Sequence, residues 1–428
     1  MSQIKLKLFL LLMFLVFTQG MWERIFFFSS LIQYLIDGAA LAFILFQFKF
    51  NFKMPGASVF LFLCLVSFFV GFSNNGSLVD AFFYMRFLFY TYLIYNQLFS
   101  RPITLNQWSL ILKFLCIMIL IQGVGALFNI FVLGARVEGY VGLMSSLGGT
   151  TATVFPLIIS TLILVYYLFS HRLDTKTLIV LILLFFSGLL VGFSSGKRGI
   201  YFIIPLVLIS TILLALPTLT KNGFIKKKIA GLALAGMLIF PLMIYGMINS
   251  KGLNYGLSGN ETVVEIVTNS LNYADDYEDA TDQYGSTIGR SNTSSRIIEN
   301  TFSDSSLFFL GLGFGATKSD IAMQSLGYKY GIVGFTRDVV SGGFFLSFFT
   351  IILICRIILI NKSIKTNVST LTRRAMVIVF LYTHLFYSSD FTVSLKINLI
   401  LILIMVLLNS PVHHMVLLDL LKTKKLIK

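Results

Sequence analysis

Apolar stretches about as long as a membrane is thick follow one another along most of this chain. The hydrocarbon core of a bilayer is about 30 Å thick, so a helix needs roughly 20 apolar residues to cross it. On that criterion the sequence predicts about twelve spans, at 4–21, 25–47, 54–72, 78–99, 107–133, 150–170, 177–194, 199–217, 229–249, 339–360, 374–392 and 395–410. The fifth stretch contains Gly123 and Gly125, where it could instead break in two. The expected fold is an all-α polytopic membrane protein.

The overall composition excludes an ordinary soluble domain. Hydrophobic residues make up 57% of the chain and charged residues 12%, with a mean hydropathy of +0.87. Soluble domains have about 45–50% apolar and about 25% charged residues. The three cysteines lie far apart in apolar stretches and show no metal-ligand spacing. We therefore expect no disulfide framework, no metal site and no cofactor.

The net charge of +15 is expected to set the orientation of the helices rather than to bind nucleic acid. Most Lys and Arg residues lie between the apolar stretches, and such residues favour the cytoplasmic side. Placing the N-terminus in the cytoplasm puts these basic loops, the C-terminus included, on that side. The first apolar stretch lacks a small-residue cleavage site and is expected to remain as a helix. The basic tail 411–428 is either an interfacial helix on anionic lipid or a solvated tail.

One long polar interval, 250–338, interrupts the apolar pattern and divides the chain. Residues 1–249 would carry nine helices, 250–338 one large outer loop with short helices of its own, 339–410 three further helices, and 411–428 the tail. The same orientation puts Lys197 and Arg198 on the outer face. Basic residues in two outer segments oppose the usual charge bias, and an anionic ligand is one explanation.

Two groups of these outer basic residues have neighbours suited to a phosphate. Lys197 and Arg198 lie between glycines and serines ahead of a predicted helix start, where free N–H groups favour anions. The alternative is ordinary snorkelling at a helix end. Arg290 and Arg296 flank a run of Ser, Asn and Thr, which suits phosphate or sugar hydroxyls. The alternative there is a solvated loop face.

Arg86 lies in the middle of the fourth predicted span. A charge at the membrane centre costs about 2.5–3.5 kcal/mol on insertion scales, so it is expected to face the bundle interior and to have a partner. Two interpretations follow. Arg86 contributes to an anion site, or it forms an ion pair with Asp37 of the second span or with Asp80. Asp37 itself is interpreted as a structural partner rather than a catalyst.

Arg337 and Asp338 lie where the polar interval meets the tenth span. Asp338 could act as a general base, or it could orient an acceptor hydroxyl. Alternatively it is the N-cap of a helix that begins at Val339. His384 in the eleventh span is interpreted as a hydrogen-bonded packing residue. The glycine-rich run 311–315 is not followed by the Lys and Ser/Thr of a phosphate-binding P-loop and is a weak signal alone.

Together these features resemble the O-antigen polymerases of the Wzy type and the related O-antigen ligases. Such proteins combine many helices with one large late periplasmic loop, an Arg in an early helix and an outer turn rich in Gly and Arg. The residues that carry the resemblance are Arg86, Arg136 to Gly139, Ser195 to Gly199, Arg296, Gly311 to Gly315, and Asp338 followed by Gly342 and Gly343. Ligases carry a His in the re-entry segment, whereas 250–338 contains none, which favours a polymerase.

The resemblance implies a GT-C-like bundle in a bacterial inner membrane with both termini cytoplasmic. Its activity would be metal-independent, inverting transfer of a glycan from undecaprenyl pyrophosphate to the terminal sugar of another lipid-linked repeat unit on the periplasmic face. Asp338 and Arg337 would be catalytic. The residues implied to bind pyrophosphate or glycan are Arg86, Arg136, Lys197, Arg198, Arg290 and Arg296. Implied partners are the lipid-linked oligosaccharide, membrane lipid, a chain-length regulator and a flippase.

Two other functions fit part of the pattern. A ligase would pass finished polymer to an outer acceptor. A lipid-linked oligosaccharide flippase or other transporter would also have about twelve helices. Transporters usually place charges and broken helices near the midplane and often show repeated halves. Here the large loop occurs only once, so the two halves of the chain are unlike. The sequence therefore favours polymerase over ligase and transporter.

Overall fold

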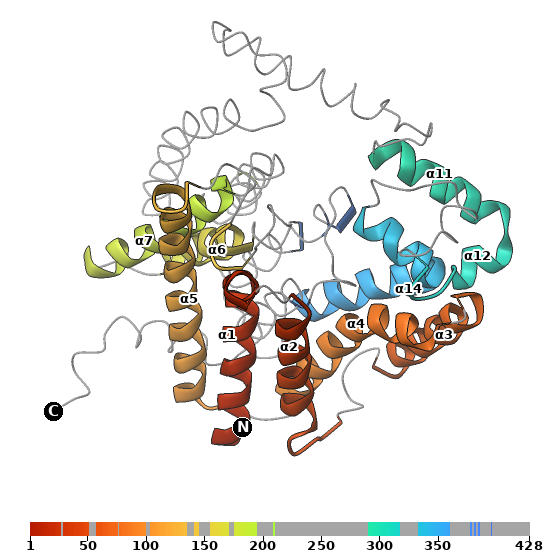
Figure 1. The fold of residues 1–428 in the computed structure, drawn as a ribbon, viewed down its shortest axis with the longest axis horizontal. Coiled ribbons are helices and arrows are strands. Elements are labelled where there is room, and N and C mark those ends of the chain that lie inside the picture. The colour runs from red at the N-terminus through yellow and green to blue at the C-terminus, as the bar shows by residue number, and fades with distance from the viewer. Residues whose placement is uncertain are drawn as a thin grey trace, which may run out of the picture.

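The structure is a computed structural model of the chain, and it describes part of it. The described residues are 1–26, 29–50, 57–75, 77–99, 103–134, 141–144, 155–170, 175–194, 209, 290–316, 333–359, 377–378, 381, 384–385 and 395. Nearly all of them lie in helices (Figure 1). The predicted span 229–249 lies wholly outside this part, and only a few residues of the predicted spans 199–217, 374–392 and 395–410 lie within it. The tail 411–428 and the candidate residues Arg136, Lys197 and Arg198 also lie outside it.

Helices occupy the positions of the first seven predicted spans and of the tenth. They are α1 (Gln3–Phe26), α2 (Ser29–Leu45), α3 (Ala57–Asn75), α4 (Leu78–Phe99), α5 (Leu105–Phe131), α6 (Phe155–Ser170), α7 (Thr175–Ser194) and α14 (Gly334–Leu359). Helix α5 continues through Gly123 and Gly125, so the predicted alternative break there is wrong. In the polar interval the structure has α11 (Arg290–Ser303) and α12 (Ser305–Leu310), which confirms the expectation of short helices.

Several of these helices have the length and composition of membrane spans. Within the described residues, Gln3–Ile25, Leu110–Phe131 and Gly334–Leu353 are long and apolar enough to cross a bilayer. Shorter apolar helices cover Leu31–Leu45, Ser58–Asn74 and Leu178–Gly192. Their outward faces carry large apolar side chains as well, such as Phe62, which is 63% exposed. Helices that are apolar on both faces suit a lipid surrounding rather than water.

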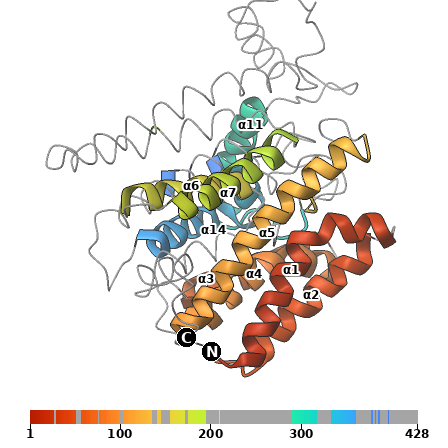
Figure 2. The same cartoon turned by 90° about the vertical axis from the view of Figure 1, so that its left-hand side faces the viewer.

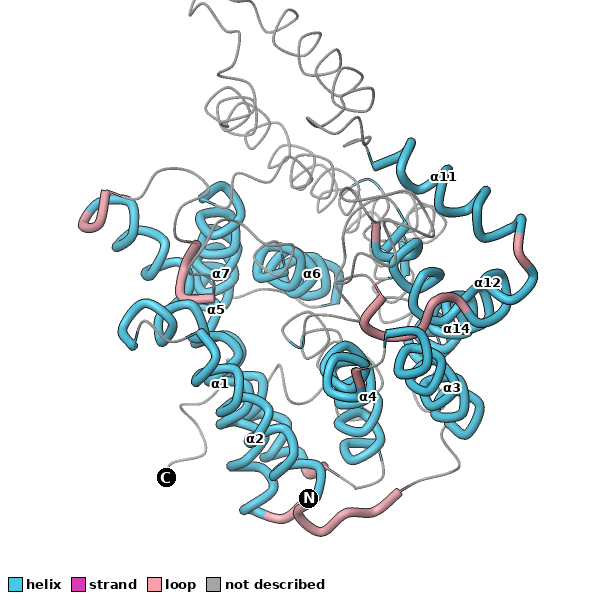
Figure 3. The backbone as a smooth tube through the Cα atoms, turned by 45° about the vertical axis from the view of Figure 1, so that its right-hand side comes forward, coloured by secondary structure: helices cyan, strands magenta, loops and turns pink. Residues whose placement is uncertain are grey.

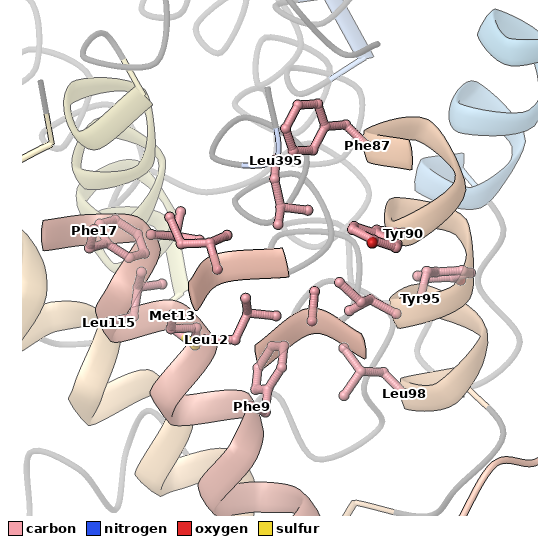
Figure 4. Close-up of a cluster of buried hydrophobic side chains, with 14 of the residues drawn as sticks. Phe9, Leu12, Met13, Phe17, Phe87, Tyr90, Tyr95, Leu98, Leu115 and Leu395 are labelled. Atoms are coloured by element: carbon pink, nitrogen blue, oxygen red, sulfur yellow. The ribbon is translucent and has the colours of Figure 1, made fainter. Parts of the chain in front are cut away.

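The N-terminal helices pack around a shared apolar core. Helices α1, α2 and α5 run side by side (Figure 2), and α4 packs against α2 and α3. Figure 4 shows side chains of α1, among them Phe9 and Phe17, meeting Tyr90 and Leu98 of α4 and Leu115 of α5. Dense packing of this kind holds helices together where lipid gives little hydrophobic driving force.

Buried polar side chains hydrogen-bond the same helices together at one end, in a cluster that we call a polar tie. The Lys5 ammonium donates to Gln97 Oε1 at 2.8 Å and to the Phe46 carbonyl at 3.0 Å. The Gln97 side chain in turn donates to the Lys49 carbonyl at 3.0 Å. The start of α1, the end of α2 and the end of α4 therefore meet, as expected for helices that alternate in direction. Lys5 is fully buried in this tie and is not a residue of an open basic loop.

A second polar tie lies at the other end of α1. The Arg24 guanidinium donates to Asn129 Oδ1 and to the Gly142 carbonyl, both at 2.8 Å. Gln122 donates to the Phe17 carbonyl at 2.6 Å and accepts from the Leu143 N–H at 2.8 Å. These bonds hold the segment 141–144 against α1 and α5. They also satisfy backbone groups that have no helical partner.

Candidate active site

Helix α14 is broken in the middle and folds back on itself. Gly342 (φ −154°, ψ 21°) and Gly343 (φ 64°, ψ −173°) both leave the helical conformation. In a straight helix residues 335 and 348 would be about 20 Å apart, at a rise of about 1.5 Å per residue. The ring centroids of Phe335 and Phe348 are only 5.8 Å apart. The first half of α14 (334–341) therefore turns back towards the second half (344–359).

The break is possible because other groups bond the backbone that it frees. Gly343 has a positive φ, which a residue without a Cβ adopts at little cost. The Val340 carbonyl, whose helical partner would lie beyond the break, accepts a 2.7 Å hydrogen bond from the Leu312 N–H. The Ser347 hydroxyl donates to the Gly343 carbonyl at 2.8 Å. Irregular backbone at membrane depth needs such partners within the protein.

Asp338 lies in the first half of α14 and faces His384. The His384 Nε2 atom is 3.4 Å from Asp338 Oδ2, and the two side chains are 0% and 2% exposed. The Phe335 ring meets the imidazole edge to face, with centroids 6.5 Å apart. Because α14 begins at Gly334, Asp338 is inside the helix, and its interpretation as an N-cap is wrong.

We call Asp338 and His384 the acid–base pair. An imidazole can accept a proton from a substrate hydroxyl, and a neighbouring carboxylate orients the ring and stabilises the imidazolium that forms. The 3.4 Å contact between His384 Nε2 and Asp338 Oδ2 does not have hydrogen-bond geometry, and catalytic contacts of this kind often tighten only when substrate binds. Arg337, the next residue along α14, is only partly buried. The arrangement can perform general acid–base chemistry.

The helices of the polar interval pack over this broken helix. Helix α12 contacts α14 and α3 (Figure 3), and α11 contacts both α12 and α14. Phe308 and Phe309 of α12 stack on Phe344 and Phe345 just after the break, with centroids 4.8 and 5.1 Å apart. Ile297 of α11 is fully buried against the same region. Residues far apart in the sequence thus pack together around the break in the helix that carries Asp338.

Helix α12 begins at a well-formed cap. The Asp304 carboxylate accepts hydrogen bonds from the Ser306 N–H at 2.7 Å and the Ser306 hydroxyl at 2.8 Å. These bonds favour the ionised carboxylate and hold the pKa of Asp304 below its ordinary value. Asp is a favoured N-cap because its side chain satisfies an N–H that has no helical partner. The cap fixes where α12 starts and so where its phenylalanines lie.

Arg86 and Asp37 form an ion pair between α4 and α2. Arg86 Nη1 is 3.3 Å from Asp37 Oδ2, with side-chain exposures of 6% and 14%. The guanidinium also lies over the rings of Phe83 and Phe87, 3.8 and 4.5 Å from their centroids. This confirms the expected ion pair of Arg86 with Asp37. A contribution of Arg86 to an anion site stays a prediction.

The remaining candidate residues fall into two groups. Arg296 is exposed on α11, while Arg290 is the first residue of that helix and its side chain is not described. Arg136, Lys197 and Arg198 lie outside the described residues, and their roles stay predictions.

Sequence reasoning did not foresee the contact of His384 with Asp338. An ionisable residue in an apolar span is costly and therefore informative. The adjacent glycines at 342 and 343 signalled that α14 could break there. Neither signal predicts that these two residues lie against each other.

Comparison of the chain with models of known protein families, with curated proteins and with solved structures finds no match. Several long apolar helices, exposed apolar faces and buried polar ties define a multi-pass membrane protein. Its described part places an acid–base pair at a broken helix.

Proposed function

We propose that this protein is a polymerase of lipid-linked oligosaccharide repeat units, of the O-antigen or capsule type. It would act on the periplasmic face of a bacterial inner membrane with both termini in the cytoplasm. The observation that carries the proposal is the buried acid–base pair on a broken helix, covered by helices of the large polar loop. A glycosyl transfer to a sugar hydroxyl needs one group that accepts a proton, and this pair supplies it.

The reaction would proceed by a single displacement. The hydroxyl of the acceptor's terminal sugar attacks the anomeric carbon of the donor glycan, forming a new C–O bond as the bond to pyrophosphate breaks. The hydroxyl proton passes to His384, and Asp338 stabilises the imidazolium. The lipid pyrophosphate leaves with the bonding electron pair, and the configuration at the anomeric carbon inverts.

The leaving pyrophosphate would be met by fixed cations. Its developing negative charge needs no proton if guanidinium or ammonium groups already lie beside it. Arg296 on the exposed face of α11 and Arg337 beside the pair are the described residues suited to this role. Lys197 and Arg198 remain predicted contributors for the reasons given by the sequence. In this mechanism no step requires a metal ion or a cofactor.

The test begins with surface polysaccharide from cells that lack the gene, separated by electrophoresis, and with its restoration by plasmid-borne variants. The proposal predicts that deletion collapses the ladder to core plus one repeat unit. The wild-type gene and Asp304→Asn, an exposed carboxylate in the same region, restore the ladder. Asp338→Asn and His384→Gln do not, although immunoblots show normal amounts in the membrane. A full ladder with Asp338→Asn would contradict the proposal.

A ligase is the second candidate, and the position of His384 favours it. The absence of a His from 250–338 was the reason to prefer a polymerase, yet a His from a later segment lies beside Asp338. The two functions differ in what accumulates when the gene is deleted. Loss of a ligase leaves long polymer attached to the lipid carrier. Loss of a polymerase leaves single units that are still transferred to the core. Extraction of the lipid-linked fraction separates these outcomes.

A further inference from the structure

The glycine turn, residues 311–316, is wedged between two helices that are distant from it in sequence. All six of its residues are buried. The Phe314 N–H donates to the Ser67 carbonyl of α3 at 3.0 Å, and the Leu312 N–H donates to the Val340 carbonyl of α14 at 2.7 Å. The Asn74 side chain of α3 donates to the Leu312 carbonyl at 3.0 Å. One short turn thus bonds to both helices.

The fit of this turn leaves no room for side chains at its glycines. Gly313 has φ +84°, and a Cβ there would overlap the backbone of Gly71 in α3. Gly311 has φ +65°, and a Cβ there would lie 2.6 Å from the Val340 carbonyl oxygen and 2.7 Å from the Gly343 nitrogen. L-residues with side chains rarely adopt such φ values. Both glycines are therefore required by conformation and by space.

The bond to Val340 links the turn directly to the acid–base pair. Val340 follows Asp338 by two residues within the first half of α14. Its carbonyl is freed by the break at Gly342 and Gly343, so the position of this half depends on the groups that bond to it. Two bonded carbonyls, one on α3 and one on α14, fix the first half of α14 relative to α3.

We propose that Gly311 and Gly313 are positioning residues, whose turn holds the first half of α14 so that Asp338 faces His384. Its significance for catalysis rests on the proposed function. The polar loop would then do more than cover the site. Its own backbone completes the structure that carries Asp338. A misplacement of about 1 Å can lower a catalysed rate by about a hundredfold, so a small shift of the turn would lower the rate strongly.

The test compares Gly313→Ala with Gly134→Ala in the full-length purified protein. Gly134 also has a positive φ, +58°, but a Cβ there meets nothing within 4 Å, so it controls for backbone strain alone. The first readout is hydrogen exchange measured by mass spectrometry on peptides covering 311–316 and 334–341. We expect exchange to rise about tenfold or more in both peptides for Gly313→Ala and in neither for Gly134→Ala. Faster exchange confined to 311–316 would overturn the proposal.

The second readout is polymerisation of lipid-linked units per molecule of protein across a range of pH. Gly313→Ala is expected to lower the rate by about a hundredfold and to shift the pH profile, because the geometry of the acid–base pair has changed. A purely structural role would lower the amount of protein and leave the rate per molecule and its pH profile unchanged. That result would overturn the proposal.

Two further variants keep the outcomes distinct. If Gly313→Ala does not accumulate, Asn74→Ala, which removes only one side-chain bond to the turn, decides the question by the same two readouts. Activity that survives Asp338→Asn would refute the proposed function, while the exchange data would still decide whether the turn positions the first half of α14. Activity lost with Asp338→Asn but unchanged in Gly313→Ala would refute the positioning role alone.

Discussion

The ion pair between Arg86 and Asp37 gives a prediction whose size can be worked from the structure. At 3.3 Å the two unit charges attract each other by about 5 kcal/mol, if the effective dielectric constant is about 20. Most of this gain offsets the loss of hydration, because the side chains are only 6% and 14% exposed. Removing one partner leaves the other charge buried, which costs about 3–5 kcal/mol. The net stabilisation from the ion pair is therefore smaller than the free-energy cost of removing one of its partners.

The perturbation is a double-mutant cycle with Asp37→Asn, Arg86→Gln and both together. We expect Asp37→Asn to lower the free energy of unfolding by about 3–5 kcal/mol, because the Arg86 charge remains over Phe83 and Phe87 without its counter-ion. Replacing both should cost clearly less than the sum of the single changes, with a coupling energy of about 1–3 kcal/mol. Equilibrium unfolding in mixed detergent micelles measures each value.

The matched control is the exposed pair Arg296 and Glu299 on α11, three residues apart. Charges on an exposed helix face couple by about 0.5 kcal/mol or less. Additive effects of Asp37→Asn and Arg86→Gln, within about 0.5 kcal/mol, would refute the reasoning about the buried pair.

The same variants separate the two roles predicted for Arg86. Arg86 Nε is buried and makes no hydrogen bond to the described part of the chain. If Arg86 binds the pyrophosphate, every Arg86 variant loses polymerisation while Asp37→Asn keeps it. If the pair is purely structural, the double variant keeps polymerisation. Ladder profiles from complemented cells distinguish these results.

Three further predictions follow from other buried or capping groups. The pKa of Asp304 is lower in the folded state, so its carboxylate stabilises α12 at pH values above the ordinary pKa. This stabilisation is lost as the pH falls through the lowered pKa. Asp304→Ser should abolish that pH dependence, as measured by hydrogen exchange of α12. Gln97→Leu should destabilise the protein by about 2–3 kcal/mol, because it leaves the buried Lys5 ammonium without its side-chain acceptor. Lys5→Met should cost less, and equilibrium unfolding in detergent measures both values. Arg24→Met should speed hydrogen exchange in 141–144, and an unchanged rate there would contradict the role of that tie.

Much of the helical framework was predictable because it depends on local properties. Length and hydropathy alone specify where a chain can cross a membrane, since a backbone in lipid must satisfy its own hydrogen bonds. The fourth predicted span, 78–99, coincides with α4, and the first seven all correspond to helices. An intramembrane Arg must also have a partner, so the ion pair of Arg86 with Asp37 could be anticipated.

The candidate site was only partly predictable. Arg337 and Asp338 stood out because they border an apolar stretch, but α14 begins at Gly334 and not at Val339. Hydropathy averages over a window and does not detect that the half carrying Asp338 turns back. For the same reason it could not show that His384 would lie against Asp338.

The sequence by itself determined that this protein is a bundle of apolar helices with one long polar interval. Only the tertiary structure decided that α14 breaks at Gly342 and Gly343, that the glycine turn bonds to α3 and α14, and that Asp338 meets His384. The physical reason is the range of the interactions. Burial in lipid acts on each segment separately, whereas a broken helix is stable only when groups from distant segments bond to its freed backbone.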